Sequence, residues 1–192
     1  MPLGVTDSDP LSAGIPEVTV RDTPMKPQLL ATIKSNNYLL NVLTHMEAID
    51  LGGTFGILVD DDGYVAESCV LNAVFITKDH TLRTPPFDGI LFGTTVRRVM
   101  DLASEFLIEE GLISSVDQSP VLASDVSGDQ VTEMFLCGGD TNLYPVVSWD
   151  GLAVGDGKVG PIAKRLLELL EGEAFGQLLG NPTDFIDVNY KD

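Results

Sequence analysis

The chain has 192 residues, a formal net charge of −18 and 44% hydrophobic residues. That length suits one good-sized domain, which would bury about 70% of the surface of its unfolded chain. Because so negative a chain repels nucleic acid and anionic lipid, and because its apolar runs are too short to span a bilayer, nucleic-acid-binding and membrane-spanning proteins are excluded. An anionic cofactor would need a site built locally, from backbone dipoles and a few cations.

Cysteine, histidine and the first residues of the chain indicate an intracellular protein without a metal site. Cys69 and Cys137 lack metal-ligand spacing and form no disulfide framework, so both are expected to be reduced. His45 and His80 lie far apart, which supports neither zinc chemistry nor a Ser-His-Asp triad. Residues 1–17 lack a basic region followed by an apolar one, so no signal peptide is expected. The predicted location is intracellular, cytoplasmic or organellar (plastid or mitochondrion), and not secreted.

The first third of the chain predicts a linker, a strand and a helix. Residues 1–28 hold five prolines and have a linker composition, with a short strand possible at 18–20. The apolar run 29–33 predicts a buried strand that ends at Lys34. From Tyr38 onward, apolar residues recur at helical spacing, and the helix is expected to end at residues 52–53, where glycine supplies a left-handed residue.

The remaining elements mix hairpins with helices. A helix is predicted from Gly93-Thr94-Thr95 to Gly111, a polar loop at 125–130 and a last helix at 161–170, with proline in its first turn. The other predicted strands are 54–59, 64–67, 70–77, 81–84, 131–136, 144–148 and 151–154. This order predicts an α+β (mixed α/β) fold rather than a strict parallel array.

Four local features could carry chemistry. Lys34 ends an apolar run, Glu67 ends a hairpin strand, residues 93–95 open a helix and residues 138–139 follow a strand. Taken singly, they are a solvated charge, a strand end, a helix cap and a turn. Together they supply what pyridoxal 5'-phosphate (PLP) needs: an amine, an acid facing the pyridine nitrogen and helix N–H groups for the phosphate.

Five motifs, in order over about residues 24–170, resemble those of class IV (fold type IV) PLP-dependent aminotransferases. They are Ile-Lys-Ser-Asn-Asn-Tyr-Leu (33–39), Gly-Tyr-Val-Ala-Glu (63–67), Asn-Ala-Val-Phe (72–75), Leu-Phe-Gly-Thr-Thr (91–95) and Pro-Val (145–146). The lysine motif is most similar to the D-amino-acid transaminase and aminodeoxychorismate lyase branches, particularly plant-type sequences. Branched-chain enzymes usually carry one more residue between this lysine and the tyrosine. The resemblance implies the large domain of the D-amino-acid aminotransferase-like fold.

The resemblance also implies roles around the cofactor ring. Lys34 would be the Schiff-base lysine and would move a proton between the substrate Cα and the cofactor. Glu67 would pair with the pyridine nitrogen. Tyr38 would lie near the phenolic oxygen of the cofactor.

Further residues would bind the cofactor phosphate or the substrate. Gly93, Thr94 and Thr95 would hold the phosphate through backbone N–H groups, with the Thr95 hydroxyl helping. Gly139 and Asp140 would lie where the family holds phosphate or substrate carboxylate. A small hydroxyl residue is usual at the position of Gly139, and the carboxylate of Asp140 would repel an anion unless it turned away.

The predicted organisation is a linker at 1–23, a PLP-binding large domain at 24–172 and a C-terminal tail at 173–192. The family has a small N-terminal domain before the lysine, whereas only 33 residues precede Lys34 here, so that domain is expected to be missing. The implied function is exchange of an amino group between an amino acid, branched-chain or D-, and a 2-oxo acid, by a homodimer. Two alternatives stay open: an aminodeoxychorismate lyase-like activity, and a truncated or degenerate homologue without catalysis.

Overall fold

The computed structural model describes residues 10–139 and 142–174. Their helical elements are α1 (Pro10–Ala13), α2 (Gln28–Ala31), α3 (Leu39–Asp50), α4 (Thr94–Leu102), the π-helical η1 (Ala103–Leu107), α5 (Ala123–Ser127) and α6 (Pro161–Ala174). Their strands are β1 (Ile15–Glu17), β2 (Thr19–Val20), β3 (Ile57–Val59), β4 (Val65–Ser68), β5 (Asn72–Thr77), β6 (Thr81–Thr84), β7 (Ser115–Gln118), β8 (Val131–Gly138), β9 (Asn142–Trp149) and β10 (Leu152–Ala153). The predicted mixture of helices and hairpins is confirmed.

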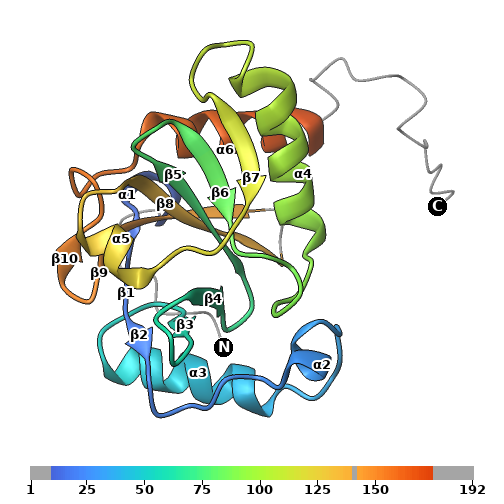
Figure 1. The fold of residues 1–192 in the computed structure, drawn as a ribbon, viewed down its shortest axis with the longest axis vertical. Coiled ribbons are helices and arrows are strands. Elements are labelled where there is room, and N and C mark those ends of the chain that lie inside the picture. Colours follow the sequence, from blue (N-terminus) through green and yellow to red (C-terminus); the bar gives the residue numbers. More distant parts are fainter. Residues whose placement is uncertain (1–9, 140–141, 175–192) are drawn as a thin grey trace, which may run out of the picture.

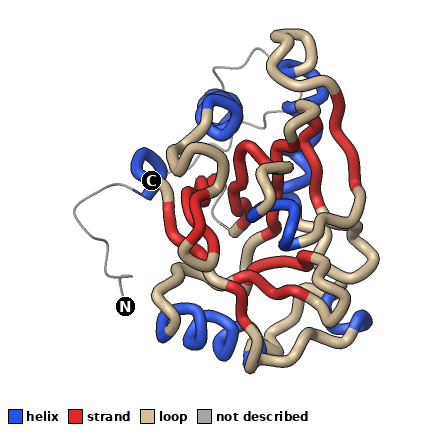
Figure 2. Tube along the Cα trace, turned by 60° about the vertical axis from the view of Figure 1, so that its left-hand side comes forward, coloured by secondary structure: helices blue, strands red, loops and turns tan. Residues whose placement is uncertain are grey.

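The strands form one sheet in the order β1-β9-β8-β5-β4-β3-β2, with β10 beside β9 and with β6 and then β7 beside β5. The pairs among β3, β4, β5, β8 and β9 are antiparallel, whereas β1 joins β9 and β2 joins β3 in parallel. The strands curl around a shared interior with helices on the outside (Figure 2). In Figure 1, α4 and α6 cover one part of the sheet, and α2 and α3 lie at the opposite end of the molecule.

The central strands are buried on both faces, which explains their continuous apolar runs. All six residues of β5 are buried. Because side chains alternate along a strand, Val74 and Ile76 pack in the core that contains α4 and α6, whereas Ala73 and Phe75 pack in the interior core on the other face. Burial of each such large side chain contributes about 1.5–3 kcal/mol.

A buried acid attaches α6 to the sheet. Glu133 on β8 accepts hydrogen bonds from the N–H groups of Ile162 and Ala163 at 3.0 and 2.9 Å, so its side chain caps the first turn of the helix. A Cβ on Gly160 would lie 2.0 Å from Cδ of Glu133. Glycine is therefore needed there for the close approach.

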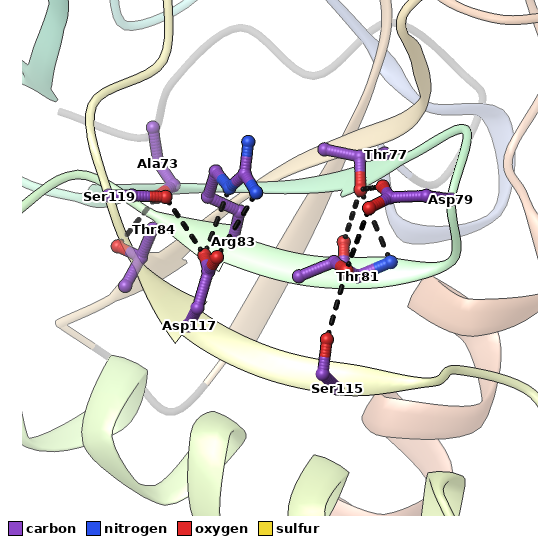
Figure 3. A network of polar contacts seen from close by, with 9 residues as sticks. All are labelled: Ala73, Thr77, Asp79, Thr81, Arg83, Thr84, Ser115, Asp117 and Ser119. Carbon is purple, nitrogen blue, oxygen red and sulfur yellow. Dashed lines mark hydrogen bonds and ion pairs between the residues drawn. The ribbon is translucent and has the colours of Figure 1, made fainter.

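Polar contacts join β5, β6 and β7 at the side of the sheet (Figure 3). The guanidinium of Arg83 donates two hydrogen bonds to Asp117, at 2.9 and 3.1 Å. The Thr84 hydroxyl donates to the carbonyl of Ala73 at 3.1 Å. These bonds cross neighbouring strands and fix their register.

Most predicted elements are confirmed, with boundaries that shift by a few residues. The helix after Tyr38 is α3, and Gly52, with a φ of +88°, follows its end. The helix after Gly93 is α4 continued by η1, and α6 extends four residues beyond the predicted end, to Ala174. Its last two residues lie in the segment predicted as a tail, and residues 175–192 lie outside the described ones.

The predicted strand at 29–33 is wrong. Residues 28–31 form the helical turn α2, in which the N–H groups of Leu30 and Ala31 donate to the carbonyl of Pro27. Only Ala31 is buried in this turn, and Leu29 is 73% exposed. A short apolar run does not distinguish a strand from a helical turn, and Lys34 therefore follows a turn rather than a buried strand.

Two further segments differ from the sequence analysis. Part of the predicted polar loop at 125–130 is helical, because α5 turns Val126 into the interior core. Strands β1 and β7 have no counterpart among the predicted elements. Strands β1 and β2 both lie within residues 1–23, the segment with linker composition.

None of the helices in residues 10–139 and 142–174 is long and apolar enough to cross a membrane.

Apolar side chains also line the outer face of α3. The exposed face, which we call the α3 face, consists of Leu39, Val42, Leu43, Met46 and Ile49, each 39–65% exposed. Exposed apolar groups therefore form a contiguous row along this helix.

Glu17 at the end of β1 is a buried acid held by backbone donors. Its side chain is 1% exposed and accepts hydrogen bonds from the N–H groups of Phe55 and Gly56, at 2.7–3.1 Å. Burial raises its pKa from 4.5 to about 7, against the opposing effect of those N–H groups. Because the folded state binds this proton more tightly than the unfolded state, the stabilisation is full below pH 4.5 and is lost as the pH rises through 7.

We expect the Glu17→Gln variant to gain stability over the wild type as the pH rises. Between pH 5 and pH 8 the difference in the free energy of unfolding should shift by about 2–3 kcal/mol in favour of the variant, since glutamine does not titrate. Urea denaturation of both proteins at the two pH values measures the shift. A difference that stays constant with pH would contradict the raised pKa.

Candidate active site

The site is built around Glu67, whose strand follows a tight turn. The Asp60 carboxylate accepts hydrogen bonds from the N–H groups of Asp62 and Tyr64, and Gly63 has a φ of +88°. This turn reverses the chain, so that β4 runs antiparallel to β3. Glu67 is thereby placed one strand away from Asn72, its partner in the register of β4 and β5.

The Glu67 carboxylate is 5% exposed and has two polar partners. The Lys26 ammonium lies 2.9 Å from Oε1, and the N–H of Leu91 donates to Oε2 at 3.2 Å. Burial raises the pKa of Glu67, whereas Lys26, the Leu91 N–H and the charge of Lys34 act to lower it. The acid is therefore buried beside positive charge on one side of a small cleft.

Lys34 and Tyr38 line the same cleft as Glu67, a space of about 60 Å³. Both come from the loop between α2 and α3; Lys34 is exposed and Tyr38 is 40% exposed. One turn into α3, the Asn41 side chain donates a hydrogen bond to the carbonyl of Cys69. This bond ties the start of α3 to the turn after Glu67, so the lysine loop and the acid face one space.

The start of α4 adjoins this cleft. Gly93 is the N-cap residue of α4 and has an extended backbone. Thr94 is exposed, whereas only 9% of the surface of Thr95 is exposed. The first N–H groups of a helix have no partner within it, and together with the helix dipole they favour an anion. Asn72 and Leu91, which line the cleft, both lie against this segment.

Gly139 lies at the end of β8, next to the same region. It has a φ of +71°, and no atom lies within 4 Å of where its Cβ would be. The preceding Gly138 packs against Leu71, which lines the cleft. Asp140 lies outside the described residues.

The structure thus brings together three of the predicted site residues, Lys34, Tyr38 and Glu67. The start of α4 and Gly139 do not line this cleft; Gly93 is connected to it through Asn72, and Gly139 through the contact of its neighbour Gly138 with Leu71. Lys26 is the residue that sequence reasoning missed. It stands between Pro24 and Pro27, in a segment whose composition indicates a linker, and a lysine there has no periodic signal. Only the tertiary fold shows its contact with Glu67, 41 residues away.

Comparisons with known proteins identify the family of the chain. The family model for amino-transferase class IV matches residues 5–149. The chain is 41% identical over 155 residues to the chloroplastic D-amino-acid transaminase of Arabidopsis thaliana, covering 80% of this chain and 41% of that protein. It spans less than half the length of the curated relatives it matches.

Two solved structures show a similar fold. The branched-chain amino acid aminotransferase of Escherichia coli matches with a TM-score of 0.75 and 28% identity, over 95% of this chain and 58% of that one. The T.th. branched-chain amino acid aminotransferase with pyridoxamine 5'-phosphate matches with a TM-score of 0.77 and 24% identity, over 88% of this chain and 54% of that one. With the family model covering most of its length, the chain belongs to the class IV aminotransferase family.

Proposed function

We propose that this chain is the PLP-binding part of an aminotransferase that exchanges an amino group between an amino acid and a 2-oxo acid. The observation that carries the proposal is the common cleft of an exposed lysine, Lys34, and a buried acid, Glu67, beside the N-terminus of α4. The names of the relatives support branched-chain or D-amino acids as the amino donor class. The T.th. structure, which contains pyridoxamine 5'-phosphate, supports the cofactor.

The residues present fit PLP in kind. Glu67 supplies a buried carboxylate for a protonated ring nitrogen, and the start of α4 supplies N–H donors for a phosphate. The cleft of about 60 Å³ is smaller than the usual ligand pocket of about 300 Å³ or more. Bound PLP would therefore extend out of this cleft.

Each residue then has a defined task. When bound, PLP supplies an aldehyde and an electron-withdrawing ring that stabilises negative charge at the substrate Cα. Lys34 would hold the cofactor through its amine, and once free, that amine would take the substrate Cα proton at Nζ and return it. Glu67 would accept a hydrogen bond from the ring N–H, and Thr94 and Thr95 would hold the phosphate through their backbone N–H groups. Tyr38 would lie beside the phenolic oxygen.

We expect Lys34 to be the residue that PLP modifies. The purified chain is mixed with PLP, reduced with borohydride, digested and analysed by mass spectrometry. A pyridoxyl group should be found on Lys34 and should disappear in Lys34→Ala, whereas Lys78→Ala, which removes an exposed lysine elsewhere, should leave it in place. Equal labelling of Lys26, Lys34 and Lys78, or no labelling, would overturn the cofactor site.

The PLP-loaded chain is then assayed for amino transfer with a panel of branched-chain and D-amino acids. Appearance of the matching 2-oxo acid, lost in Lys34→Ala, supports an aminotransferase and names the donor. Inactivity of the loaded protein across the whole panel would contradict it. Release of 4-aminobenzoate from aminodeoxychorismate would instead indicate the lyase activity.

Lys26 should keep Glu67 ionised. Replacing it in Lys26→Met leaves a buried carboxylate without its cation and should cost about 3 kcal/mol of unfolding free energy at pH 7.5. The same change raises the pKa of Glu67 further, so the cost should shrink at pH 5, where the acid takes up a proton. Urea denaturation of Lys26→Met and of the control Lys78→Met tests this, and an equal loss at both pH values would show that Lys26 acts by packing alone.

We also propose a homodimer that associates through the α3 face, and a small N-terminal domain in the intact enzyme. The net charge of −18 opposes self-association, so burial of apolar area must drive it. The compartment stays a prediction: intracellular, with a plastid supported by the name of the Arabidopsis relative.

The dimer is tested by light scattering. The wild type should have twice the mass of one chain, and Met46→Glu, which puts a charge into the α3 face, should be monomeric. Leu152→Glu is the matched control, since Leu152 is 56% and Met46 57% exposed, and it should remain dimeric. A monomeric wild type, or two variants with the same mass, would contradict the proposed interface.

A further inference from the structure

Asn72 occupies the junction between the acid and the helix. It is the first residue of β5, is 4% exposed and pairs in register with Glu67 on one side and Cys137 on the other. Its side chain leaves the strand toward the segment that leads into α4 and donates from Nδ2 to the carbonyl of Leu91 at 2.7 Å. A buried carboxamide that donates a hydrogen bond to a second segment fixes the distance between its own strand and that segment.

Leu91 bonds to Glu67 through its N–H group and to Asn72 through its carbonyl group. Its N–H donates to Glu67 at 3.2 Å, while its carbonyl accepts from Asn72 and from the N–H of Gly93 at 3.0 Å. Glu67, Leu91 and Asn72 therefore form a closed loop of contacts that includes the pairing of β4 with β5. Movement of the helix start away from the acid would break two of these hydrogen bonds together.

Gly93 provides the second, independent observation. A Cβ added there would lie 2.3 Å from Oδ1 of Asn72. Its backbone has φ −67° and ψ 143°, which any residue adopts. Position 93 therefore needs glycine because the Asn72 side chain approaches closely, and not because of its backbone angles. The contact depends on both residues.

We propose that Asn72, seated against Gly93, is the positioning residue that sets the phosphate-binding N-terminus of α4 at a fixed distance from Glu67. The inference rests on the proposed function, because it assigns the helix start to phosphate and the acid to the ring nitrogen. PLP carries its phosphate on a short CH2–O arm of the ring that contains the nitrogen, so the spacing between the two sites decides whether both groups are bound together. Asn72 touches neither reacting atom and acts through Leu91 and Gly93.

The test compares PLP with pyridoxal, which has the same ring and aldehyde but no phosphate. Both are titrated by absorbance into the wild type, Asn72→Ala, Gly93→Ala and the double variant. The wild type should bind PLP more tightly than pyridoxal. Asn72→Ala should weaken PLP binding about tenfold and pyridoxal binding less than about twofold, as expected for lost placement of the phosphate donors.

The double variant tests the contact itself. Gly93→Ala alone should weaken PLP binding about as much as Asn72→Ala, because its methyl group displaces the side chain. In the Asn72→Ala background the same change should add less than about twofold, since the atom that it would meet has gone. Additive losses would show that Gly93 and Asn72 act separately, which overturns the inference.

A readout without cofactor separates this inference from the proposed function. Hydrogen exchange of the Leu91 and Gly93 amides, which donate to Glu67 and to the Leu91 carbonyl, should accelerate in Asn72→Ala and stay unchanged in Thr77→Val. That control removes the hydroxyl of another buried β5 residue, which contacts Asp79 and the backbone N–H and carbonyl of Thr81. Unchanged exchange in Asn72→Ala would overturn the inference whatever the protein binds.

The titrations then decide the rest. A wild type that binds PLP and pyridoxal equally would count against the proposed phosphate site, and the exchange result would still judge Asn72. A preference for PLP that persists in Asn72→Ala would overturn the positioning role and leave the proposed function standing.

Discussion

The buried carboxylate of Glu67 requires positive partners, and three segments of the chain meet to provide them. Removing an ionised carboxylate from water without a partner costs several kcal/mol, so its surroundings have to follow it. Lys26 comes from the N-terminal segment and the Leu91 N–H from the approach to α4, while the loop with Lys34 lies along the same cleft. The position of one acid thereby links segments that are distant in sequence.

Two other buried acids are stabilised differently, mainly by hydrogen bonds from backbone N–H groups. Glu17 accepts from the segment before β3, and Glu133 accepts from the first turn of α6. Burial raises the pKa of both. In a chain with 29 acidic and 11 basic side chains, cations are scarce, so structural acids bind backbone donors. The pairing of Glu67 with Lys26 departs from this pattern, which sets the cleft apart from the structural sites.

The sequence predicts the parts of the fold whose burial is regular. The runs that became β5 and β8 are apolar on both faces, and the helix after Gly93 has one apolar face, so their types follow from residue pattern alone. The run at 29–33 is apolar as well, but its side chains are mostly exposed. A local sequence pattern shows which residues are apolar, and it does not show what the segment packs against. Strand β1 is only three residues long and contains Pro16, and its pairing with β9 depends on residues more than 120 positions away.

The candidate site was predictable to a similar extent. Motif order predicts Lys34, Glu67 and the start of α4 as site residues, and in the structure Lys34 and Glu67 line one cleft. The contacts that connect them were not predictable, because each is a single polar contact between distant segments: Lys26 with Glu67, and Asn72 with Leu91. Residue type and spacing indicate which groups a site contains, whereas the groups that hold them in place become visible only with coordinates.

The charge of the chain explains why such local arrangement matters. At physiological salt, exposed charges are screened beyond about 8 Å, so an anion that approaches the cleft is attracted only by what lies close to it. Lys26 is paired with Glu67, and the positive groups near the cleft, among the described residues, include Lys34, Arg97 in the first turn of α4 and the first N–H groups of that helix. Screening limits the range of these groups, and the dipole of a helix weakens within its first turn. Binding of a phosphate therefore depends on where the first turn of α4 lies, and that position is set by the buried contacts of Leu91 rather than by the net charge of the protein.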